Sequence, residues 1–196
     1  LHEFGIRDQE KVILFVGRLV ENKGVHILLR AFYGVQKEVD AAKLVIVGGG
    51  ELESSLRSLA QKLGVEKKVL FLGKFPQGKM PHIYSGADVF VLPTLYSEPF
   101  GIAATEALSS GVPVIASNVG GLKEIVRHDE VGYLITPGDV KMLESFLVKL
   151  LSNDAERDRC GKNARKRALD KFSWEKIGSK ISNLYKGVLE AKLKYE

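Results

Sequence analysis

The stretch KVILFVGRLVENKGVHILLRAF, Lys11 to Phe32, decides the fold that the sequence predicts. Its first part, KVILFVG, is apolar after the lysine and ends in glycine, which is typical of a strand buried on both faces. The next part carries Val25, Leu28, Leu29 and Phe32 at helical spacing and predicts an amphipathic helix. A buried strand followed by a helix is the unit from which parallel sheets are built.

The same unit recurs along the rest of the chain. Further strands are predicted at 42–50, 67–73, 87–93, 112–117 and 132–136. Helices are predicted between them and after them, at 51–64, 79–87, 100–108, 120–127, 139–151, 154–171 and 173–194, with Asp139 as an N-cap. Helical crossovers require parallel strands, so we predict an α/β fold with a doubly wound, mostly parallel, six-stranded Rossmann-like sheet and helices on both faces.

Composition excludes several classes of protein. The 196-residue chain is 45% hydrophobic and 27% charged, as expected of a globular domain with its own core. No apolar run approaches the roughly 20 residues of a membrane span, and the first residues, LHEFGIRDQE, do not resemble a signal or transit peptide. The lone cysteine, Cys160, cannot form an internal disulfide bond, so we expect a cytoplasmic protein.

The net charge of +5 is unevenly spread, because much of the positive excess lies beyond Arg157. A solvated helix face accounts for such a run, and contact with acidic membrane lipids or a phosphorylated acceptor is the alternative. Aromatic residues do not interleave with the basic ones, so we expect no nucleic acid partner.

Polar residues gather where the predicted strands end. Ligands bind beyond the carboxyl ends of parallel strands, and in the common strand order 3-2-1-4-5-6 the crevice lies between the first and fourth strands. Each of the first four strands is followed by candidate ligand residues: Gly17, Arg18 and Lys23; Gly48, Gly49 and Gly50; Gly73, Lys74 and Phe75; and Glu98, Pro99, Phe100, Gly101, Ile102 and Glu106. We therefore expect two cations and two carboxylates to meet there.

These residue types suit a diphosphate that carries a ribose and a further group. Arg18 acts as a fork and Lys23 as a point charge on one polyanion. Pro99 is predicted in the first turn of a buried helix, so that the free amides of Phe100, Gly101 and Ile102 form an anion site.

The two carboxylates suit the rest of such a ligand. Glu106 interrupts an otherwise apolar helix and suits two vicinal hydroxyls such as those of a ribose, whereas Glu98 faces whatever the diphosphate carries. Three alternatives stay open: a helix cap for Glu98, an ion pair of Arg18 with Glu21, and a simple turn for the triple glycine. Metal-ligand spacing is absent among the histidines, which are His2, His26, His82 and His128.

The segment SEPFGIAATEALSSGVPVIAS, 97–117, resembles the E-x7-E motif of retaining, nucleotide-sugar-dependent glycosyltransferases with the GT-B architecture. GRLVENKGVHILLRAF resembles the phosphate loop of that family. LVIVGGGELESSLRSLA, VLFLGKF, ADVFVLPT, VGGLKEIV and GYLITPGD follow in the family's order, so the resemblance covers nearly the whole chain.

The resemblance implies transfer of a hexosyl group, with retention, from a nucleotide-diphosphate sugar such as UDP-, GDP- or ADP-hexose, without a metal or cofactor. Arg18 and Lys23 would stabilise the leaving diphosphate and Glu98 would contact the sugar, which makes these three the catalytic residues. Glu106 would hold the ribose hydroxyls. The rest of the donor site would comprise Gly17, Gly48, Gly49, Gly73, Lys74, Phe75, Pro99, Phe100, Gly101 and Ile102, with the base near residues 73–75.

GT-B enzymes have two such domains, and the resemblance implies that residues 1–172 are the donor-binding one. Residues 173–196 would form a C-terminal helix that packs toward an N-terminal acceptor-binding domain or subunit absent from this sequence, so the domain alone would transfer little. A lipid-linked acceptor and a peripheral position on the inner face of the membrane are compatible with the basic C-terminal helices. A glycogen or starch synthase type of domain, or a non-catalytic nucleotide-sugar-binding subunit, is the alternative.

Overall fold

The computed structural model describes residues 4–193; His2 and the last residues of the predicted C-terminal helix, 194–196, lie outside the described residues. A six-stranded sheet forms its centre, with the order β3-β2-β1-β4-β5-β6 and every neighbouring pair parallel. The strands are β1 (Lys11–Val16), β2 (Ala42–Val47), β3 (Val69–Gly73), β4 (Val89–Leu92), β5 (Val114–Ser117) and β6 (Gly132–Ile135). The predicted doubly wound fold is confirmed.

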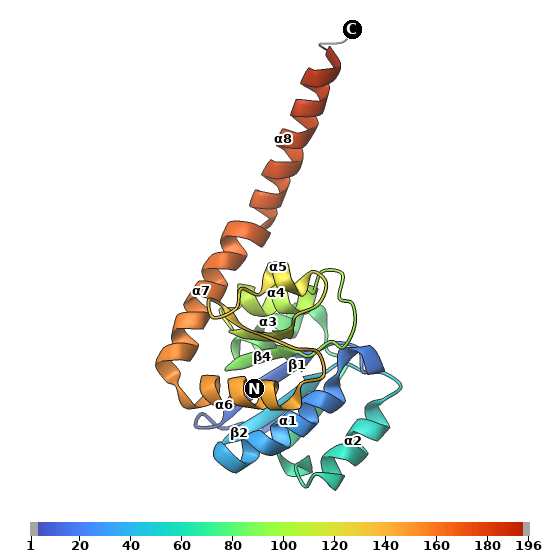
Figure 1. Ribbon diagram of the computed structural model, residues 1–196, viewed down its shortest axis with the longest axis vertical. Coiled ribbons are helices and arrows are strands. Elements are labelled where there is room, and N and C mark those ends of the chain that lie inside the picture. Colours follow the sequence, from blue (N-terminus) through green and yellow to red (C-terminus); the bar gives the residue numbers. More distant parts are fainter. Residues whose placement is uncertain (1–3, 194–196) are drawn as a thin grey trace.

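Helices cover both faces of this sheet (Figure 1). One face carries α1 (Val25–Glu38), α2 (Glu53–Lys62) and α6 (Val140–Ser152), which pack on one another through α1. The other carries α3 (Met80–Ser85), α4 (Ile102–Ser109), α5 (Leu122–Ile125) and α7 (Asp154–Phe172), which pack around α4. The last helix is α8 (Trp174–Leu193), and 3₁₀ turns occupy η2 (Glu21–Lys23), η3 (Glu66–Lys68) and η4 (Gln77–Lys79).

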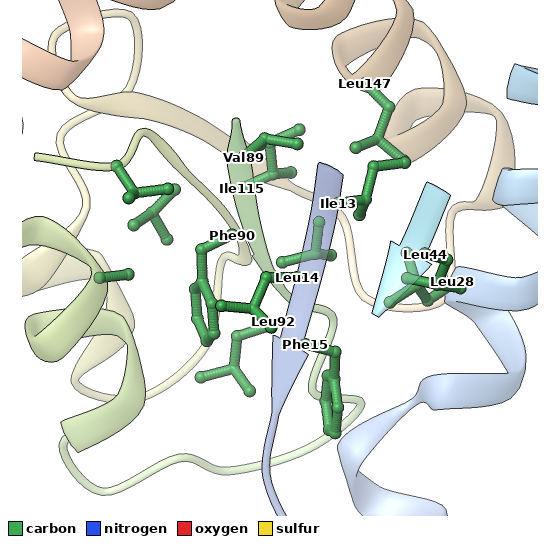
Figure 2. Packing of buried hydrophobic residues seen from close by; sticks show 14 of the residues in the cluster. Ile13, Leu14, Phe15, Leu28, Leu44, Val89, Phe90, Leu92, Ile115 and Leu147 are labelled. Atoms are coloured by element: carbon green, nitrogen blue, oxygen red, sulfur yellow. The ribbon is translucent and has the colours of Figure 1, made fainter. Parts of the chain in front are cut away.

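The core lies on both sides of β1, as its apolar sequence predicts. Ile13, Leu14 and Phe15 are fully buried, and successive side chains of a strand point to opposite faces. Figure 2 shows them among buried residues of β2, β4 and β5, together with Leu28 of α1 and Leu147 of α6. The central strands are therefore rigid supports for the loops at their ends.

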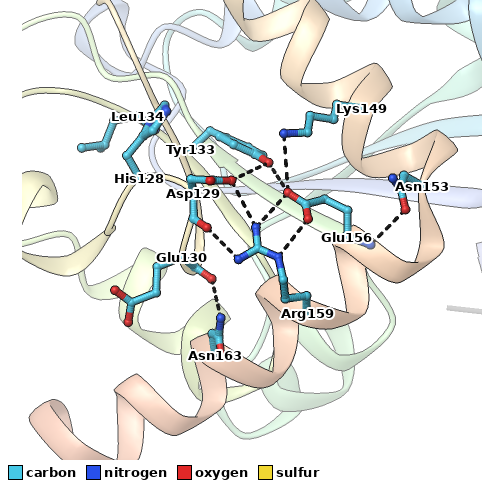
Figure 3. Close-up of polar contacts among 10 residues, drawn as sticks. All are labelled: His128, Asp129, Glu130, Tyr133, Leu134, Lys149, Asn153, Glu156, Arg159 and Asn163. Carbon is cyan, nitrogen blue, oxygen red and sulfur yellow. Dashed lines mark hydrogen bonds and ion pairs between the residues drawn. The ribbon is translucent and has the colours of Figure 1, made fainter.

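A polar network fastens α7 to the edge of the sheet (Figure 3). The carboxylate of Glu156 accepts two hydrogen bonds of 2.9 Å from Arg159 and one from the hydroxyl of Tyr133 on β6, and it lies 3.5 Å from the ammonium of Lys149. Arg159 also reaches the carbonyl oxygen of Asp129, at 2.8 Å. The hydrogen bonds from Arg159 and then Tyr133 lower the pKa of Glu156 to about 2.

Capping residues begin the two helices that close the fold. The side chain of Asp139 accepts a hydrogen bond from the amide of Met142 at 2.9 Å, so the predicted N-cap of α6 is confirmed. Asn153 caps α7 in the same way, through the amide of Glu156 at 3.0 Å.

Helix α8 leaves the body of the molecule and runs outward as a long arm (Figure 1). Trp174 is 85% exposed, and an apolar stripe along the helix is exposed with it, comprising Ile181, Leu184, Tyr185, Val188 and Leu189. Among residues 4–193, no helix is long and apolar enough to cross a membrane.

Candidate functional site

Three loops at the carboxyl end of the sheet are joined by their main chains. The amide of Gly48 donates to the carbonyl of Gly73 at 2.7 Å, and that of Leu19 donates to Gly49 at 3.0 Å. Gly48 has a φ of +131°, and a Cβ there would overlap the carbonyl oxygen of Gly17. The loops after β1, β2 and β3 therefore form one surface, which needs glycine at this point.

A pocket of about 410 Å³ lies on this surface, next to the place where strand order reverses between β1 and β4. Seven of the sequence-predicted site residues line it: Gly17, Arg18, Gly48, Gly49, Lys74, Phe75 and Glu106. The rest of the lining is Val16, Val47, Gln77 and Met80. Residues from four segments of the chain are thus brought together around one cavity.

Arg18 supplies the pocket with a cation that the protein leaves available. Its side chain is exposed, and within residues 4–193 it forms neither a hydrogen bond nor an ion pair, so the alternative pairing with Glu21 does not occur there. An arginine in this state presents its donors in a fork that suits phosphate oxygens.

Glu106, which is half-buried, also lines the pocket. The sequence indicated a stray acid in an apolar helix, but the structure gives it two partners. Its Oε2 accepts a hydrogen bond of 2.7 Å from the hydroxyl of Tyr84, and its Oε1 accepts one of 3.1 Å from Nε2 of Gln77. The carboxylate is held in a fixed direction, and neither of its partners is a cation.

Lys23 and Glu98 form an ion pair with each other, with side chains that are 18% and 13% exposed. The pair joins η2, after β1, to the loop that connects β4 with α4. Asn22 strengthens the same connection: its Oδ1 accepts from the amide of Tyr96 at 3.0 Å and its carbonyl accepts from that of Leu95 at 2.8 Å. The second cation and the second carboxylate therefore meet each other, and neither belongs to the lining of the pocket.

The loop that carries Glu98 is also supported from β5. The amide of Gly121 donates to the carbonyl oxygen of Glu98 at 2.9 Å. Gly120 has a φ of +49°, and a Cβ on it would overlap that same oxygen. The VGG segment is therefore a backbone support for the acidic loop.

The predicted start of the acidic helix is wrong by two residues. α4 begins at Ile102, with Gly101 as its N-cap at a φ of +96°, so Pro99 lies in the preceding loop and not in the first turn. The amides of Ala104 and Thr105 already bond to the carbonyl of Gly101. The helical amides without such a bond belong to Ile102 and Ala103, whereas those of Phe100 and Gly101 precede the helix.

The side chains of Phe100 and Ile102 are exposed and line a second, larger cavity. The ring of Phe100 packs edge-on against Phe172, with 6.0 Å between centroids. This cavity of about 830 Å³ is an apolar groove between α3, α4 and the junction of α7 with α8. Gln77, Met80 and Glu106 lie in the walls of both cavities, so the two are adjacent.

The carboxyl end of the sheet also holds two buried side-chain oxygens without a partner in the described part of the chain, Thr94 Oγ1 and Ser117 Oγ. The described residues contain no cluster of three or more His, Cys, Asp or Glu side chains that could hold a metal ion.

Sequence reasoning missed Asn22, Gln77, Tyr84 and Gly120 as site residues. Asn22 and Gly120 belong to the segments GRLVENKG and VGGLKEIV. A turn-forming residue close to the end of a strand is the sequence signal that could have indicated them. No local pattern marks Tyr84 or Gln77, because each meets Glu106 across more than 20 residues of chain.

A family model described as glycosyl transferases group 1 matches residues 2–167. An uncharacterized glycosyltransferase of Methanocaldococcus jannaschii is 40% identical over 186 residues, which are 95% of this chain and 47% of that protein. The D-inositol 3-phosphate glycosyltransferase of Corynebacterium glutamicum is 36% identical over 189 residues, covering 93% of this chain and 45% of that one. The chain thus spans about half the length of the curated relatives it matches.

Solved structures give the same picture. The Anabaena protein HepE, crystallised with UDP and glucose, superposes with a TM-score of 0.86 at 26% identity. The match covers 94% of this chain and 50% of HepE.

Proposed function

The chain belongs to the glycosyl transferases group 1 family, and from this premise we propose that it binds a nucleotide-diphosphate sugar as the donor-binding half of a retaining hexosyltransferase. One observation carries the proposal: Arg18, which has no partner among residues 4–193, and Glu106, a carboxylate held by two hydrogen bonds, line one pocket next to the switch point of a doubly wound sheet. A diphosphate needs the first group and a ribose the second.

The donor lies across the pocket in this proposal. Its diphosphate meets Arg18, its ribose hydroxyls donate to Glu106, and its base stacks near Lys74 and Phe75. The complex of HepE with UDP and glucose supports this class of ligand. The hexose and the position of the base are our proposals for this chain.

In the reaction, the bond between C1 of the sugar and the diphosphate oxygen breaks while an acceptor hydroxyl bonds to C1 from the same face. The acceptor's proton passes to the departing diphosphate. Arg18 and Lys23 neutralise the charge that develops on the leaving group, which is the electrostatic contribution that a fixed cation makes best. Lys23 has three donor positions, so it can contact phosphate while it keeps Glu98.

Glu98 contacts the donor sugar in this arrangement. Its loop is held on one side by Lys23 and on the other by the Gly120–Gly121 backbone. A carboxylate supported in this way accepts hydrogen bonds from sugar hydroxyls without having to be ordered first.

The acceptor is bound by a further half of the enzyme, which packs on the apolar stripe of α8. The exposed stripe and the length of the relatives support this proposal. Large exposed apolar surfaces mark contact sites. Because the acceptor site lies on the other half in this proposal, the donor domain alone transfers little.

Calorimetry with UDP, GDP and ADP, each with and without an attached hexose, tests the donor site. We expect binding by the unmodified chain, and a loss of affinity of about tenfold or more in Arg18→Ala and in Glu106→Ala, because each removes a charged hydrogen-bond partner. Arg30→Ala is the matched control, since Arg30 is also exposed and has no ion pair among residues 4–193. Undiminished binding in both site variants would show that the ligand lies elsewhere.

A further inference from the structure

Two of the acceptor positions on the carboxylate of Glu106 are already used by hydrogen bonds from within the protein. Tyr84 donates to Oε2 at 2.7 Å and Gln77 donates to Oε1 at 3.1 Å, so each oxygen carries one hydrogen bond. An ionised carboxylate offers about four acceptor positions. One position therefore remains on each oxygen, and Glu106 lines both cavities.

The two donors differ in how firmly they are held. Tyr84 is 1% exposed and its ring packs against Phe90, with 5.8 Å between centroids. Gln77 is exposed, on a short 3₁₀ turn. The direction of the carboxylate is therefore set by the tyrosine, and the glutamine is the adjustable partner.

Tyr84 can act only as a donor in this contact. Burial, and then the hydrogen bond and charge of Glu106, raise the pKa of Tyr84 well above its ordinary value. The phenol keeps its proton throughout the physiological range, so the carboxylate is left to accept from the ligand.

We propose that Tyr84 is a positioning residue, which holds Glu106 so that its two remaining acceptor positions receive the vicinal hydroxyls of a ribose and the pocket selects ribonucleotides over 2′-deoxyribonucleotides. This inference rests on the proposed function and adds to it the group that sets sugar selectivity. Each of the two vicinal hydroxyls of a ribose can donate to one of the two free acceptor positions of Glu106. A 2′-deoxyribose has only one of these hydroxyls, so one acceptor position stays without a hydrogen bond.

The test measures the affinities of UDP, GDP and ADP and of their 2′-deoxy counterparts by calorimetry. For the unmodified chain we expect the ribonucleotide that binds best to exceed its deoxy form by about tenfold, the value of one hydrogen bond to a charged acceptor. Tyr84→Phe, which removes only the hydroxyl, should lower that ratio severalfold. In a Glu106→Gln background, adding Tyr84→Phe should change the ratio no further, because the tyrosine acts through the carboxylate.

Tyr133→Phe is the matched control. Tyr133 is also 1% exposed and its hydroxyl also donates to a carboxylate, that of Glu156, on another side of the molecule. The Tyr133→Phe variant should lose thermal stability as Tyr84→Phe does, but its ratio of ribonucleotide to 2′-deoxyribonucleotide affinity should stay unchanged.

Two outcomes would contradict the proposal, and they are distinct. Ribonucleotide binding with the same ratio in the unmodified chain and in Tyr84→Phe would make the tyrosine a structural residue only and leave the proposed function intact. No binding of any nucleotide by the unmodified chain would overturn the proposed function and this inference with it.

Discussion

Gly48 is the residue on which the geometry of the pocket most depends. Its φ of +131° lies in a region that only glycine adopts readily, and its Cα faces the carbonyl oxygen of Gly17. We predict that Gly48→Ala lowers the free energy of unfolding by at least about 1–3 kcal/mol, from backbone strain alone. It should also weaken nucleotide binding, because the loop after β1 has to move. Urea unfolding and calorimetry measure the two effects.

The neighbouring glycine provides the control. Gly49 has no positive φ, and a Cβ there would meet only the side chain of Lys74, at 3.6 Å. Gly49→Ala should therefore fold with nearly unchanged stability. Equal losses in the two variants would mean that the loop tolerates neither side chain for a reason other than backbone geometry.

Single site residues could be predicted where a charged side chain stands in an otherwise apolar element or directly after a strand. Arg18 beside a strand end and Glu106 in an apolar helix stood out, and both line the pocket. The contacts between charged groups were not predictable: the structure pairs Lys23 with Glu98, and their expected contacts with phosphate and sugar stay predictions. Pairing depends on how two loops approach in space, and neither loop encodes that in its own sequence.

At the scale of elements, the existence and type of each strand and α-helix followed from period and length, whereas the 3₁₀ turns η2 and η3 were not predicted. Boundaries did not follow as well, and α4 is the example. Gly101 is the N-cap of the helix: its φ is +96°, and a Cβ there would overlap the side chain of Leu122 on α5. The helix start is therefore fixed by a tertiary contact, which no reading of the segment 97–108 by itself contains.

Glu156 determines how the contact between α7 and β6 responds to acid. Its pKa in the folded protein is about 2, against an ordinary value of 4.5. A carboxylate with a lowered pKa contributes stability that is fully present above its unfolded pKa and is lost as the pH falls through the folded one. We therefore predict that Glu156→Gln is less stable than the unmodified chain at pH 7. This difference should shrink steadily between about pH 4.5 and pH 2.

Urea unfolding curves at a series of pH values measure this difference. Glu51→Gln is the control, because Glu51 is exposed and has no ion pair in the part of the chain that the structure describes. It should show no comparable dependence. A difference for Glu156→Gln that stays constant down to pH 2 would mean that the carboxylate makes no charge-dependent contact in solution.

At the scale of the whole molecule, topology was the most predictable property. A chain of buried strands joined by helices has few unknotted, right-handed arrangements open to it, and the strand order 3-2-1-4-5-6 is one of the commonest. The position of α8 could not be derived in this way. Its apolar stripe predicts burial, but the partner for that stripe does not lie within residues 4–193, where the helix extends into solvent (Figure 1).

Because α8 packs so little on the body, we predict that it is dispensable for the stability of the body. The structure shows the side chains of Gly178 to Leu189 exposed, and exposed side chains contribute little to the free energy of unfolding. Truncation after Ile177 should leave the Tm within about 2 °C. It should also lessen self-association at high concentration, since it removes exposed Leu184, Tyr185 and Val188. Calorimetric scans and sedimentation measure the two properties.

Truncation after Asn153 is the comparison, because it also removes α7, on which Cys160, Gly161, Ala164 and Ala168 are buried. That shorter chain should melt far lower or fail to fold. The two truncations together separate a helix that belongs to the core of this domain from one that needs a further surface to bury its stripe. A large loss of Tm on removing α8 alone would place that stripe against the body in solution, and the proposal of a second half bound to it would then lose its structural basis.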